Sequence, residues 1–425
     1  MCALAADLLF YNSRGSVPQG WKETVEAVQD NKNREAVSSL LTDMVSFATV
    51  FSLEGNVWQC WLTYMLMMHE NAFTFACERR KIQSDATLLE LAKADLSFFQ
   101  NLFQPDSCKM GLLYSMMSYK APYADLKPNR AGKLIAELSK SLSETNSTED
   151  FAAVLTGHYA KYGVGLFGLY KAFRVSDRDG AQAIVPVTDE RDVSFDDLIG
   201  LEEQKRILRE NTEAFLNGFT ANNVLLYGDS GTGKSTSIHA LMHDYYDSGL
   251  RLVEMNKQNR KFLPNVLSEI KKRNYHFIIY LDDLSFEENE SDYKELKAML
   301  EGALENRSDR VLIYATSNRR HLIRETWTDR NDMEYQNDIH RSDTIEEKLS
   351  LASRFGVTIY YSKPDPKEYY HIVQKLAERN GIALRENELH DLARKWELRH
   401  GGMSGRTASQ LITWLYGEAG IHTNQ

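Results

Sequence analysis

The chain has 425 residues, 43% of them hydrophobic, so it is long enough for two or three domains that each bury a core. Its 50 basic and 60 acidic residues give a formal charge of −10, which argues against indiscriminate nucleic-acid binding, although local basic patches can still bind phosphate. Four cysteines without metal-ligand spacing argue against a disulfide framework and against a zinc site.

The N-terminal region, residues 1–175, is expected to be a mostly helical domain. Apolar residues recur at helical spacing in Thr87–Phe103, and the apolar stretch Trp58–Met68 is too short to span a bilayer, so it is expected to be a core helix. The polar segment Lys140–Glu149 is expected to be a loop. Because Met1–Phe10 lacks the basic start of a signal peptide, we expect a cytoplasmic protein without a membrane partner.

From about Val193 onwards, short β-rich runs alternate with amphipathic helices, which is the pattern of a parallel sheet with helices on both faces. The predicted fold class is therefore α/β, with a parallel five-stranded sheet in a domain over residues 193–363. After Pro364 and Pro366 the helical periodicity returns, which predicts a small C-terminal helical domain over residues 364–425. The expected strands are Val224–Tyr227, Leu252–Met255, Phe277–Leu281, Val311–Ala315 and Val357–Tyr361.

The first of these strands is followed by a phosphate-binding pattern. Glycines let backbone N–H groups point inward around phosphates, Lys234 can reach the β- and γ-phosphates, and the Ser235 hydroxyl can ligate Mg²⁺. The helix that follows offers the positive end of its dipole to the anion. We therefore predict a site for ATP and Mg²⁺, rather than a glycine-rich turn without a ligand. The residues are Gly228, Asp229, Ser230, Gly231, Thr232, Gly233, Lys234 and Ser235, which match G-x-x-x-x-G-K-[ST], and Thr236, which follows them in the helix.

Two acidic residues, Asp282 and Asp283, end the apolar strand Phe277–Leu281. Buried parallel strands are continuous apolar runs of this kind, and the carboxyl ends of such strands form the usual ligand edge of an open α/β sheet. We expect Asp282 to hold Mg²⁺ and Asp283 to polarise the attacking water. On the next strand, Asn318 is in a position to help orient that water. The alternatives are that the carboxylates only begin a loop and that Asn318 is a turn residue.

With these motifs in this order, residues 193–417 resemble the AAA+ superfamily of P-loop ATPases. Gly228–Ser235 matches its Walker A motif, Phe277–Asp283 looks like Walker B, and Asn318 matches the sensor-one position. Asp196–Gly200 looks like the segment that lines the adenine pocket, which implies that Ile199 and Gly200 contact the nucleotide. Most members have Asp-Glu where this chain has Asp282 and Asp283, so the shorter Asp283 implies slow or partner-dependent hydrolysis.

The resemblance extends to two arginines. Ser353–Gly356 is similar to the motif that carries an arginine finger, which implies that Arg354 acts on ATP in a neighbouring subunit, where such a finger raises rates by about 10³–10⁵. Gly405–Arg406 looks like the sensor-two motif, which implies that Arg406 binds the γ-phosphate of its own chain and couples closure of the helical lid to ATP. The alternative for both arginines is a surface role. A finger acting in trans implies a homo-oligomer.

A closer resemblance links the run Ala315–Leu322, together with Ser404–Arg406, to a bacterial family of ATP-binding proteins of unassigned function. That family also pairs an N-terminal helical region with this core. The closer match points to a smaller family within the superfamily, but it does not indicate a substrate.

The sequence leaves two classes of macromolecular partner open, DNA and protein. The segment Asn256–Pro264 has Phe262 but lacks the glycine that follows the aromatic residue in protein-threading loops, and its basic residues, with Lys271–Arg273, favour a phosphate-rich partner. The alternative is a solvated helix face. The charged stretch Thr328–Lys348 is expected to be a mobile loop near a subunit interface or a surface insertion.

These features predict an ATP-binding and ATP-hydrolysing protein that couples its nucleotide state to remodelling or loading of a macromolecular partner. A second hypothesis is a nucleotide-regulated switch or scaffold with weak hydrolysis. A small-molecule kinase is disfavoured by the series Asn318, Arg354 and Arg406 and by the helical lid. A GTPase is disfavoured because no NKxD guanine motif follows the strands.

Overall fold

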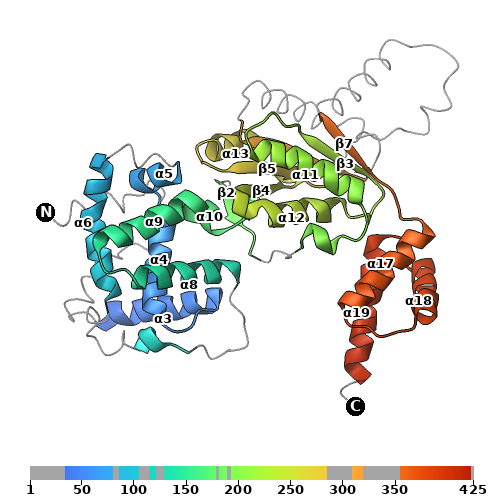
Figure 1. Ribbon diagram of the computed structural model, residues 1–425, viewed down its shortest axis with the longest axis horizontal. Coiled ribbons are helices and arrows are strands. Elements are labelled where there is room, and N and C mark those ends of the chain that lie inside the picture. Colours follow the sequence, from blue (N-terminus) through green and yellow to red (C-terminus); the bar gives the residue numbers. More distant parts are fainter. Residues whose placement is uncertain are drawn as a thin grey trace, which may run out of the picture. The chain divides into compact units, whose positions relative to one another are not determined.

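The computed structural model of the chain divides into two compact units, Met1–Tyr170 and Lys171–Gln425, which we describe separately (Figure 1). No helix in the described part of the chain is long and apolar enough to cross a membrane. The domain limits predicted from the sequence stay predictions. The structure describes residues 34–79, 86–104, 115–120, 129–178, 181–188, 193–284, 309–318 and 355–422.

The elements described in the first unit are helices. The apolar helix α4 contacts several of the others. Trp58 on α4 is fully buried, and its indole N–H donates to the Leu102 carbonyl of α6 at 3.0 Å. The Tyr159 hydroxyl of α9 donates to the Leu66 carbonyl of α4 at 2.7 Å, so these buried polar groups are paired. The helices are α3 (Arg34–Phe51), α4 (Val57–Met68), α5 (Ala72–Glu78), α6 (Ala86–Phe103), the short 3₁₀ helix η3 (Ser115–Ser118), α8 (Arg130–Ser143), α9 (Thr148–Tyr162) and α10 (Gly165–Leu169).

Three local predictions in this unit have different outcomes. The helix predicted over Thr87–Phe103 is confirmed as α6, and so is the core helix as α4. The loop predicted over Lys140–Glu149 is wrong at both ends. Helix α8 continues into this segment because buried Leu142 packs its last turn, and α9 begins directly after Ser147, whose hydroxyl oxygen accepts the Asp150 N–H.

The second unit is built on a seven-stranded sheet, and our prediction of five strands is therefore wrong in number. The strand order is β2-β1-β4-β5-β6-β3-β7, and each neighbouring pair is parallel except the hairpin β1–β2. The predicted strands form the contiguous block from β4 to β7. The strands are β1 (Ala172–Arg178), β2 (Ala181–Pro186), β3 (Val224–Gly228), β4 (Leu250–Met255), β5 (His276–Leu281), β6 (Val311–Ser317) and β7 (Val357–Tyr361).

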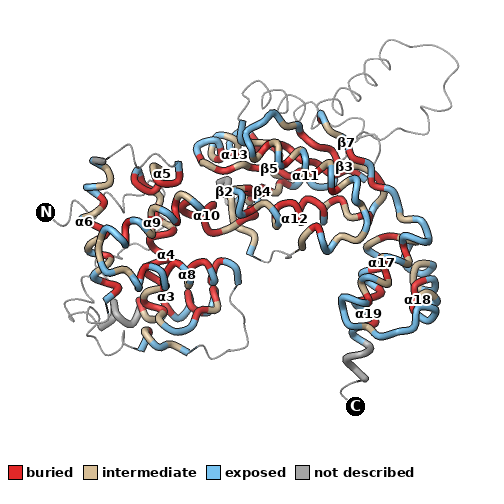
Figure 2. Tube along the Cα trace, in the orientation of Figure 1, coloured by how far each residue is buried: buried red, intermediate tan, exposed pale blue. Residues whose placement is uncertain are grey.

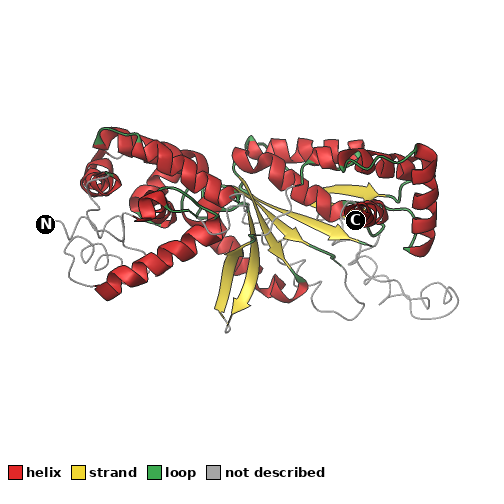
Figure 3. Cartoon of the chain, turned by 90° about the horizontal axis from the view of Figure 1, so that it is seen from below, coloured by secondary structure: helices red, strands yellow, loops and turns green. Residues whose placement is uncertain are grey.

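The hairpin β1–β2 was missed because β1 is not a continuous apolar run. Its buried residues Phe173 and Val175 alternate with Arg174, which forms an ion pair with Glu254 on the neighbouring strand β4 at 3.0 Å. A strand with one buried face shows this period of two in its side chains. Figure 3 shows the resulting twisted sheet edge-on, with β1 and β2 as part of it.

Helices α11 (Glu202–Leu216) and α12 (Lys234–Tyr245) pack on one face of the sheet. Alternate strand residues point to this face, such as Val224 with Leu226 on β3 and Ile278 with Tyr280 on β5, and they are buried. Figure 2 shows that the strands of this sheet are largely buried. Because β3 to β7 are parallel, their carboxyl ends meet at one edge, where the candidate site lies. Shorter elements are η4 (Phe195–Asp197), η5 (Tyr246–Ser248), η6 (Lys257–Phe262) and α13 (Leu263–Ile270).

Three C-terminal helices pack around their own small core. They are α17 (Pro366–Arg379), α18 (Glu386–Arg399) and α19 (Gly405–His422), and we call them the lid. Tyr369, Val373 and Leu411 are fully buried at its centre. Asp365 caps α17 through a reciprocal pair of hydrogen bonds with Glu368, which fixes where the chain enters the lid.

Candidate functional site

A tight glycine-containing loop joins β3 to α12. Gly228 has φ +134°, and a Cβ built on it would lie 2.1 Å from the carbonyl oxygen of Tyr361, so only glycine fits there. Gly231 and Gly233 also have positive φ, and Gly233 caps the N-terminus of α12. The Thr232 hydroxyl donates to the Asp229 carbonyl at 2.8 Å and closes the turn. The loop therefore ends at a helix N-terminus, whose free N–H groups and dipole attract anions.

Lys234 lies inside this loop. Its ammonium group donates to the carbonyl oxygens of Gly228 at 3.0 Å and Asp229 at 2.6 Å, and the residue is 6% exposed. Burial lowers the pKa of Lys234, and the negative charges of Asp229, Asp283 and Asp282 act in the opposite direction. Within the part of the chain that the structure describes, carbonyl groups and not a direct ion pair with a carboxylate therefore hold this positive charge at the start of α12.

Ser235, the next residue, contacts the carboxylate of Asp282 at the end of β5. The Ser235 hydroxyl donates to Asp282 Oδ1 at 3.1 Å. Tyr280 and Thr316 donate to the same oxygen at 2.5 and 2.7 Å. Burial alone would raise the pKa of Asp282, but these three hydrogen bonds together with the backbone N–H of Asp283 outweigh it and hold the pKa below its ordinary value. A hydroxyl beside an ionised carboxylate is a donor set that fits a hard divalent cation such as Mg²⁺.

Asp283 and Asn318 also meet at this edge. The Asn318 side-chain amide donates to Asp283 Oδ1 at 2.9 Å. Asp283 has φ +47°, in the left-handed region that favours glycine and that aspartate adopts more readily than most other residues. Its own N–H donates to Thr316 Oγ1 at 3.0 Å, which helps to hold this conformation. The structure thus brings together Ser235, both aspartates and Asn318.

The segment before α11 lies on the other side of the loop. Side chains of Leu198 and Leu201 would be 3.6 and 3.2 Å from a Cβ built on Gly233, so the segment that contains Ile199 and Gly200 runs close to the loop. Lys205 on α11 is 6% exposed and donates to the Leu198 carbonyl at 2.5 Å. This hydrogen bond holds the segment against α11.

The lid reaches the same loop. The backbone N–H of Arg406 donates to the Gly231 carbonyl at 3.2 Å, and its exposed side chain starts beside this glycine. Arg379 on α17 donates to the carbonyl of Asp196 and lies 3.6 Å from the carboxylate of Asp197. Two lid arginines therefore flank the loop and the segment before α11.

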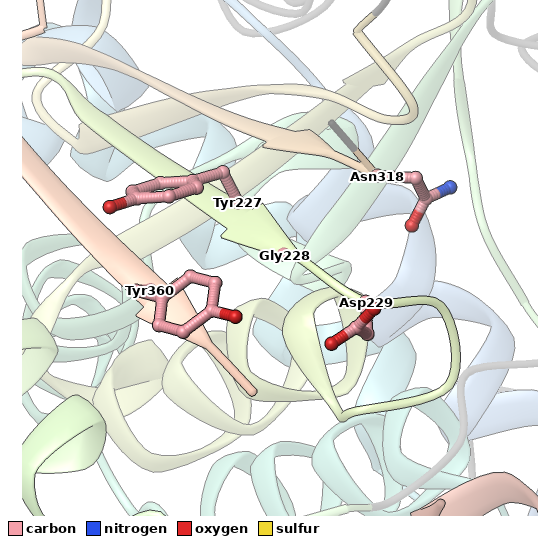
Figure 4. A pocket seen from close by; sticks show the side chains of 5 residues that line it. All are labelled: Tyr227, Gly228, Asp229, Asn318 and Tyr360. Carbon is pink, nitrogen blue, oxygen red and sulfur yellow. The ribbon is translucent and has the colours of Figure 1, made fainter. Parts of the chain in front are cut away.

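A cavity of about 310 Å³ borders the first residues of the loop. Figure 4 shows the rings of Tyr227 and Tyr360 on one side, with centroids 5.3 Å apart, and the side chains of Asp229 and Asn318 on the other. Both polar residues belong to the predicted site set. The cavity therefore adjoins the same edge of the sheet.

The remaining predicted residues are either outside the described part of the chain or make none of the contacts given above. Arg354 and the stretch Thr328–Lys348 are outside the described residues. Thr236 is exposed in the first turn of α12. The basic segment Asn256–Pro264 includes the 3₁₀ helix η6, in which Arg260 is buried at 7% exposure, so it is not a fully solvated face.

Four residues at or near the site had no predicted role: Tyr280, Thr316, Lys205 and Arg379. Tyr280 carried a usable signal, because it is a polar hydroxyl two positions before Asp282 in an otherwise apolar strand and so lies on the same side of that strand. Lys205 and Arg379 carried no comparable signal, since ordinary helices are rich in both residue types.

Comparisons with known proteins identify a family and several similar proteins. The family model described as "Protein of unknown function (DUF815)" matches residues 169–419. The replication factor C large subunit of Nanoarchaeum equitans is 22% identical over 214 residues, which cover 48% of this chain and 42% of that protein. The corresponding subunit of Methanococcus vannielii is 28% identical over 120 residues, 27% of this chain and 24% of that protein. The matches span less than half the length of both relatives.

Solved structures match about half of the chain. The Thermotoga maritima RuvB Holliday junction branch migration motor is 17% identical with a TM-score of 0.36, over 52% of this chain and 63% of that one. The FIGL-1 AAA domain in complex with ADP is 22% identical with a TM-score of 0.37, over 52% of this chain and 72% of that one.

Proposed function

The chain belongs to the family described as a protein of unknown function (DUF815), and from this premise we propose that it is an ATP-binding and ATP-hydrolysing protein of the AAA+ superfamily. The observation that carries the proposal is the contact between Ser235, directly after Lys234 of the loop, and Asp282 of the neighbouring strand end. A phosphate loop and an acidic strand end so arranged serve a nucleoside triphosphate with its divalent cation.

In this proposal the loop Gly228–Ser235 binds the phosphates. Backbone N–H groups at the start of α12 donate to phosphate oxygens, and Lys234 exchanges its carbonyl partners for the β- and γ-phosphates. Ile199 and Gly200, next to the loop, contact the adenine. Ser235 and Asp282 would hold Mg²⁺, which when bound neutralises charge on the phosphate oxygens.

Hydrolysis would use Asp283 and Asn318. Water attacks the γ-phosphorus, the bond from that phosphorus to the bridging oxygen breaks, ADP leaves, and Asp283 accepts the proton of the water. Asn318, already bonded to Asp283, orients the carboxylate and the water. Because an aspartate is one methylene shorter than a glutamate, we propose slow turnover. Arg406 would contact the γ-phosphate from the lid, and Arg354 would act on the ATP of a neighbouring subunit in a homo-oligomer.

We propose that the nucleotide state drives movement of a lid domain over residues 364–425 against a core over residues 193–363, and thereby remodels or loads a macromolecular partner, DNA or protein. Two relatives carry the name replication factor C large subunit, and a role in replication is consistent with a DNA-linked partner. The second candidate is a nucleotide-regulated switch with weak hydrolysis, acting through helices within residues 1–175. The engagement of Asp283 by Asn318, which occupies one oxygen of the shorter acid, favours this candidate.

The test of the binding proposal is Lys234→Ala with ATP titrated by calorimetry. We expect loss of measurable binding, because the variant removes the buried charge of the loop. Lys375→Ala, which removes an exposed lysine from an ion pair on α17, is the control and should bind as wild type. Retained micromolar affinity in Lys234→Ala would refute the site. Steady-state hydrolysis with and without DNA then separates the two candidates, because a switch shows little turnover under both conditions.

A further inference from the structure

One oxygen of Asp282 is the acceptor for three hydroxyl groups. Tyr280 donates to Asp282 Oδ1 at 2.5 Å, Thr316 at 2.7 Å and Ser235 at 3.1 Å. Ser235 belongs to the phosphate loop, whereas the other two donors come from inside the sheet. Hydrogen bonds to an ionised carboxylate are stronger than those between neutral groups, so this cluster fixes the orientation of the acid.

The strand register explains why these two donors reach Asp282. Tyr280 lies two residues before Asp282 on β5, so both side chains leave the same side of the strand. The pairing of Leu281 with Ala315 brings Thr316, the next residue of β6, beside Asp282. Tyr280 and Thr316 are each 2% exposed, and a buried hydroxyl without a partner is costly, so the carboxylate is their natural acceptor.

Thr316 has a second role at the neighbouring acid. Its hydroxyl oxygen accepts the Asp283 N–H at 3.0 Å, and its carbonyl accepts the Leu284 N–H at 2.6 Å. These bonds hold the turn in which Asp283 takes its left-handed conformation. One side chain on β6 therefore fixes the positions of both carboxylates at the end of β5.

We propose that Tyr280 and Thr316 are positioning residues for the divalent cation of the nucleotide. This inference rests on the proposed function. The two hydroxyls satisfy Asp282 Oδ1, which leaves the other carboxylate oxygen for the cation. Ser235 gives its single proton to the same carboxylate, which leaves the lone pairs of its oxygen for the cation as well. Partners of this kind behind a ligating group typically change metal affinity by about 10–100-fold.

The test compares Tyr280→Phe, Thr316→Val and Thr316→Ser in the full chain. The measurement is the apparent dissociation constant for Mg²⁺, from Mg²⁺ titration of the binding of a fluorescent ATP analogue, together with the affinity for that analogue in EDTA. We expect Thr316→Val to weaken Mg²⁺ by about 10–100-fold and Tyr280→Phe by about tenfold. Thr316→Ser, which keeps the hydroxyl, should remain close to wild type. The affinity in EDTA should change little in all three.

The chain offers a matched control in Tyr314→Phe. Tyr314 is a fully buried tyrosine on β6 whose hydroxyl is 2.9 Å from Thr212 Oγ1 and Asn211 Nδ2, away from the candidate site. This variant loses the same atom from the same sheet, so it should lower the melting temperature without changing the Mg²⁺ affinity. If Thr316→Val does not fold, Tyr280→Phe, which removes a single oxygen atom, still decides the question.

The inference is overturned if Tyr280→Phe and Thr316→Val bind Mg²⁺ like wild type and only melt earlier, as Tyr314→Phe does. It is also overturned if Thr316→Ser is as weak as Thr316→Val. A wild-type chain that binds the ATP analogue in Mg²⁺, with unaffected variants, leaves the proposed function standing. A wild-type chain that binds no analogue in Mg²⁺ or in EDTA overturns both.

Discussion

The sheet edge and the lid contribute to the candidate site in different ways. At the sheet edge, Asp282 and Asp283 are held by hydrogen bonds from residues of the strands, including the buried Thr316. At the lid, Arg406 meets the loop through one backbone hydrogen bond, and Arg379 makes an ion pair whose side chains are 42% and 52% exposed. Exposed contacts of this kind are weak and easily exchanged.

Because of this difference, we expect a nucleotide to find a preorganised site at the sheet edge and to change the structure at the lid. Groups fixed by buried hydrogen bonds need little reorganisation when a charged ligand binds. Contacts made by exposed arginines are replaced at small cost, so the lid is the part whose position a γ-phosphate would alter. Substitutions on the two sides should therefore differ in the size and kind of their effects.

The largest effect on stability is expected for Gly228→Ala at the sheet edge. The new Cβ would lie 2.1 Å from the Tyr361 carbonyl in a backbone conformation with φ +134°, so the β3–β7 pairing must shift. We expect a loss of at least about 2 kcal/mol in the free energy of unfolding, measured by urea titration. Gly218→Ala, with φ +76° and no atom within 4 Å of the built Cβ, is the control for backbone strain alone. Equal losses in the two variants would show that the close approach to Tyr361 is unimportant.

The next effect is on turnover. Asp283→Asn removes the proposed proton acceptor but keeps the shape of the side chain and its neighbour Asn318. We expect phosphate release to fall by about 10²–10⁴-fold while ATP affinity stays within a few-fold of wild type. Asp365→Asn is the matched control, because asparagine caps a helix as well as aspartate does. Unchanged turnover in Asp283→Asn would remove Asp283 from the mechanism.

Arg406→Ala probes the lid side. The side chain begins beside Gly231, and its guanidinium is proposed to contact the γ-phosphate. We expect ATP affinity to fall by about 10–100-fold and ADP affinity by much less, as measured by competition with a fluorescent nucleotide. Arg399→Ala, an exposed arginine in the last turn of α18, should change neither. Equal losses for ATP and ADP would contradict a contact with the γ-phosphate.

The smallest effect is expected for Arg379→Ala. This variant removes the contacts of α17 with Asp196 and Asp197, which are exposed. We expect less than about a fivefold change in ATP affinity, which the same competition assay resolves. Lys375→Ala, which breaks another exposed ion pair on the same helix, gives the baseline. A loss of ATP affinity as large as that of Arg406→Ala would contradict the proposed difference between a weakly attached lid and a fixed sheet edge.

The sequence alone was sufficient to predict the elements whose local pattern is strong. The apolar run Phe277–Leu281 predicts a strand and the glycine pattern Gly228–Ser235 predicts a tight loop, because a buried parallel strand and a glycine-rich loop have distinctive local compositions. The hairpin β1–β2 was missed because Arg174 interrupts the apolar pattern of β1. The end of α8 was missed because its last turn exposes polar residues while Leu142 alone packs inward.

The contacts among the site residues could not be predicted from the sequence, for a different reason. The hydrogen bond from Thr316 to Asp282 depends on the register between β5 and β6, which no local pattern fixes. The approach of Arg379 to Asp196 depends on how the lid packs on the core of its unit. Such contacts join residues far apart in the chain, so only the folded structure brings them together.

The central claim, an ATP site between the loop and the segment before α11, is tested most directly by photolabelling with an azido-ATP and mapping the labelled peptide. The account predicts a label on the peptide that contains Ile199 and Gly200, displaced by excess ATP and absent in Lys234→Ala. A label that ATP does not displace, or that falls only on the helices of the first unit, would contradict the account.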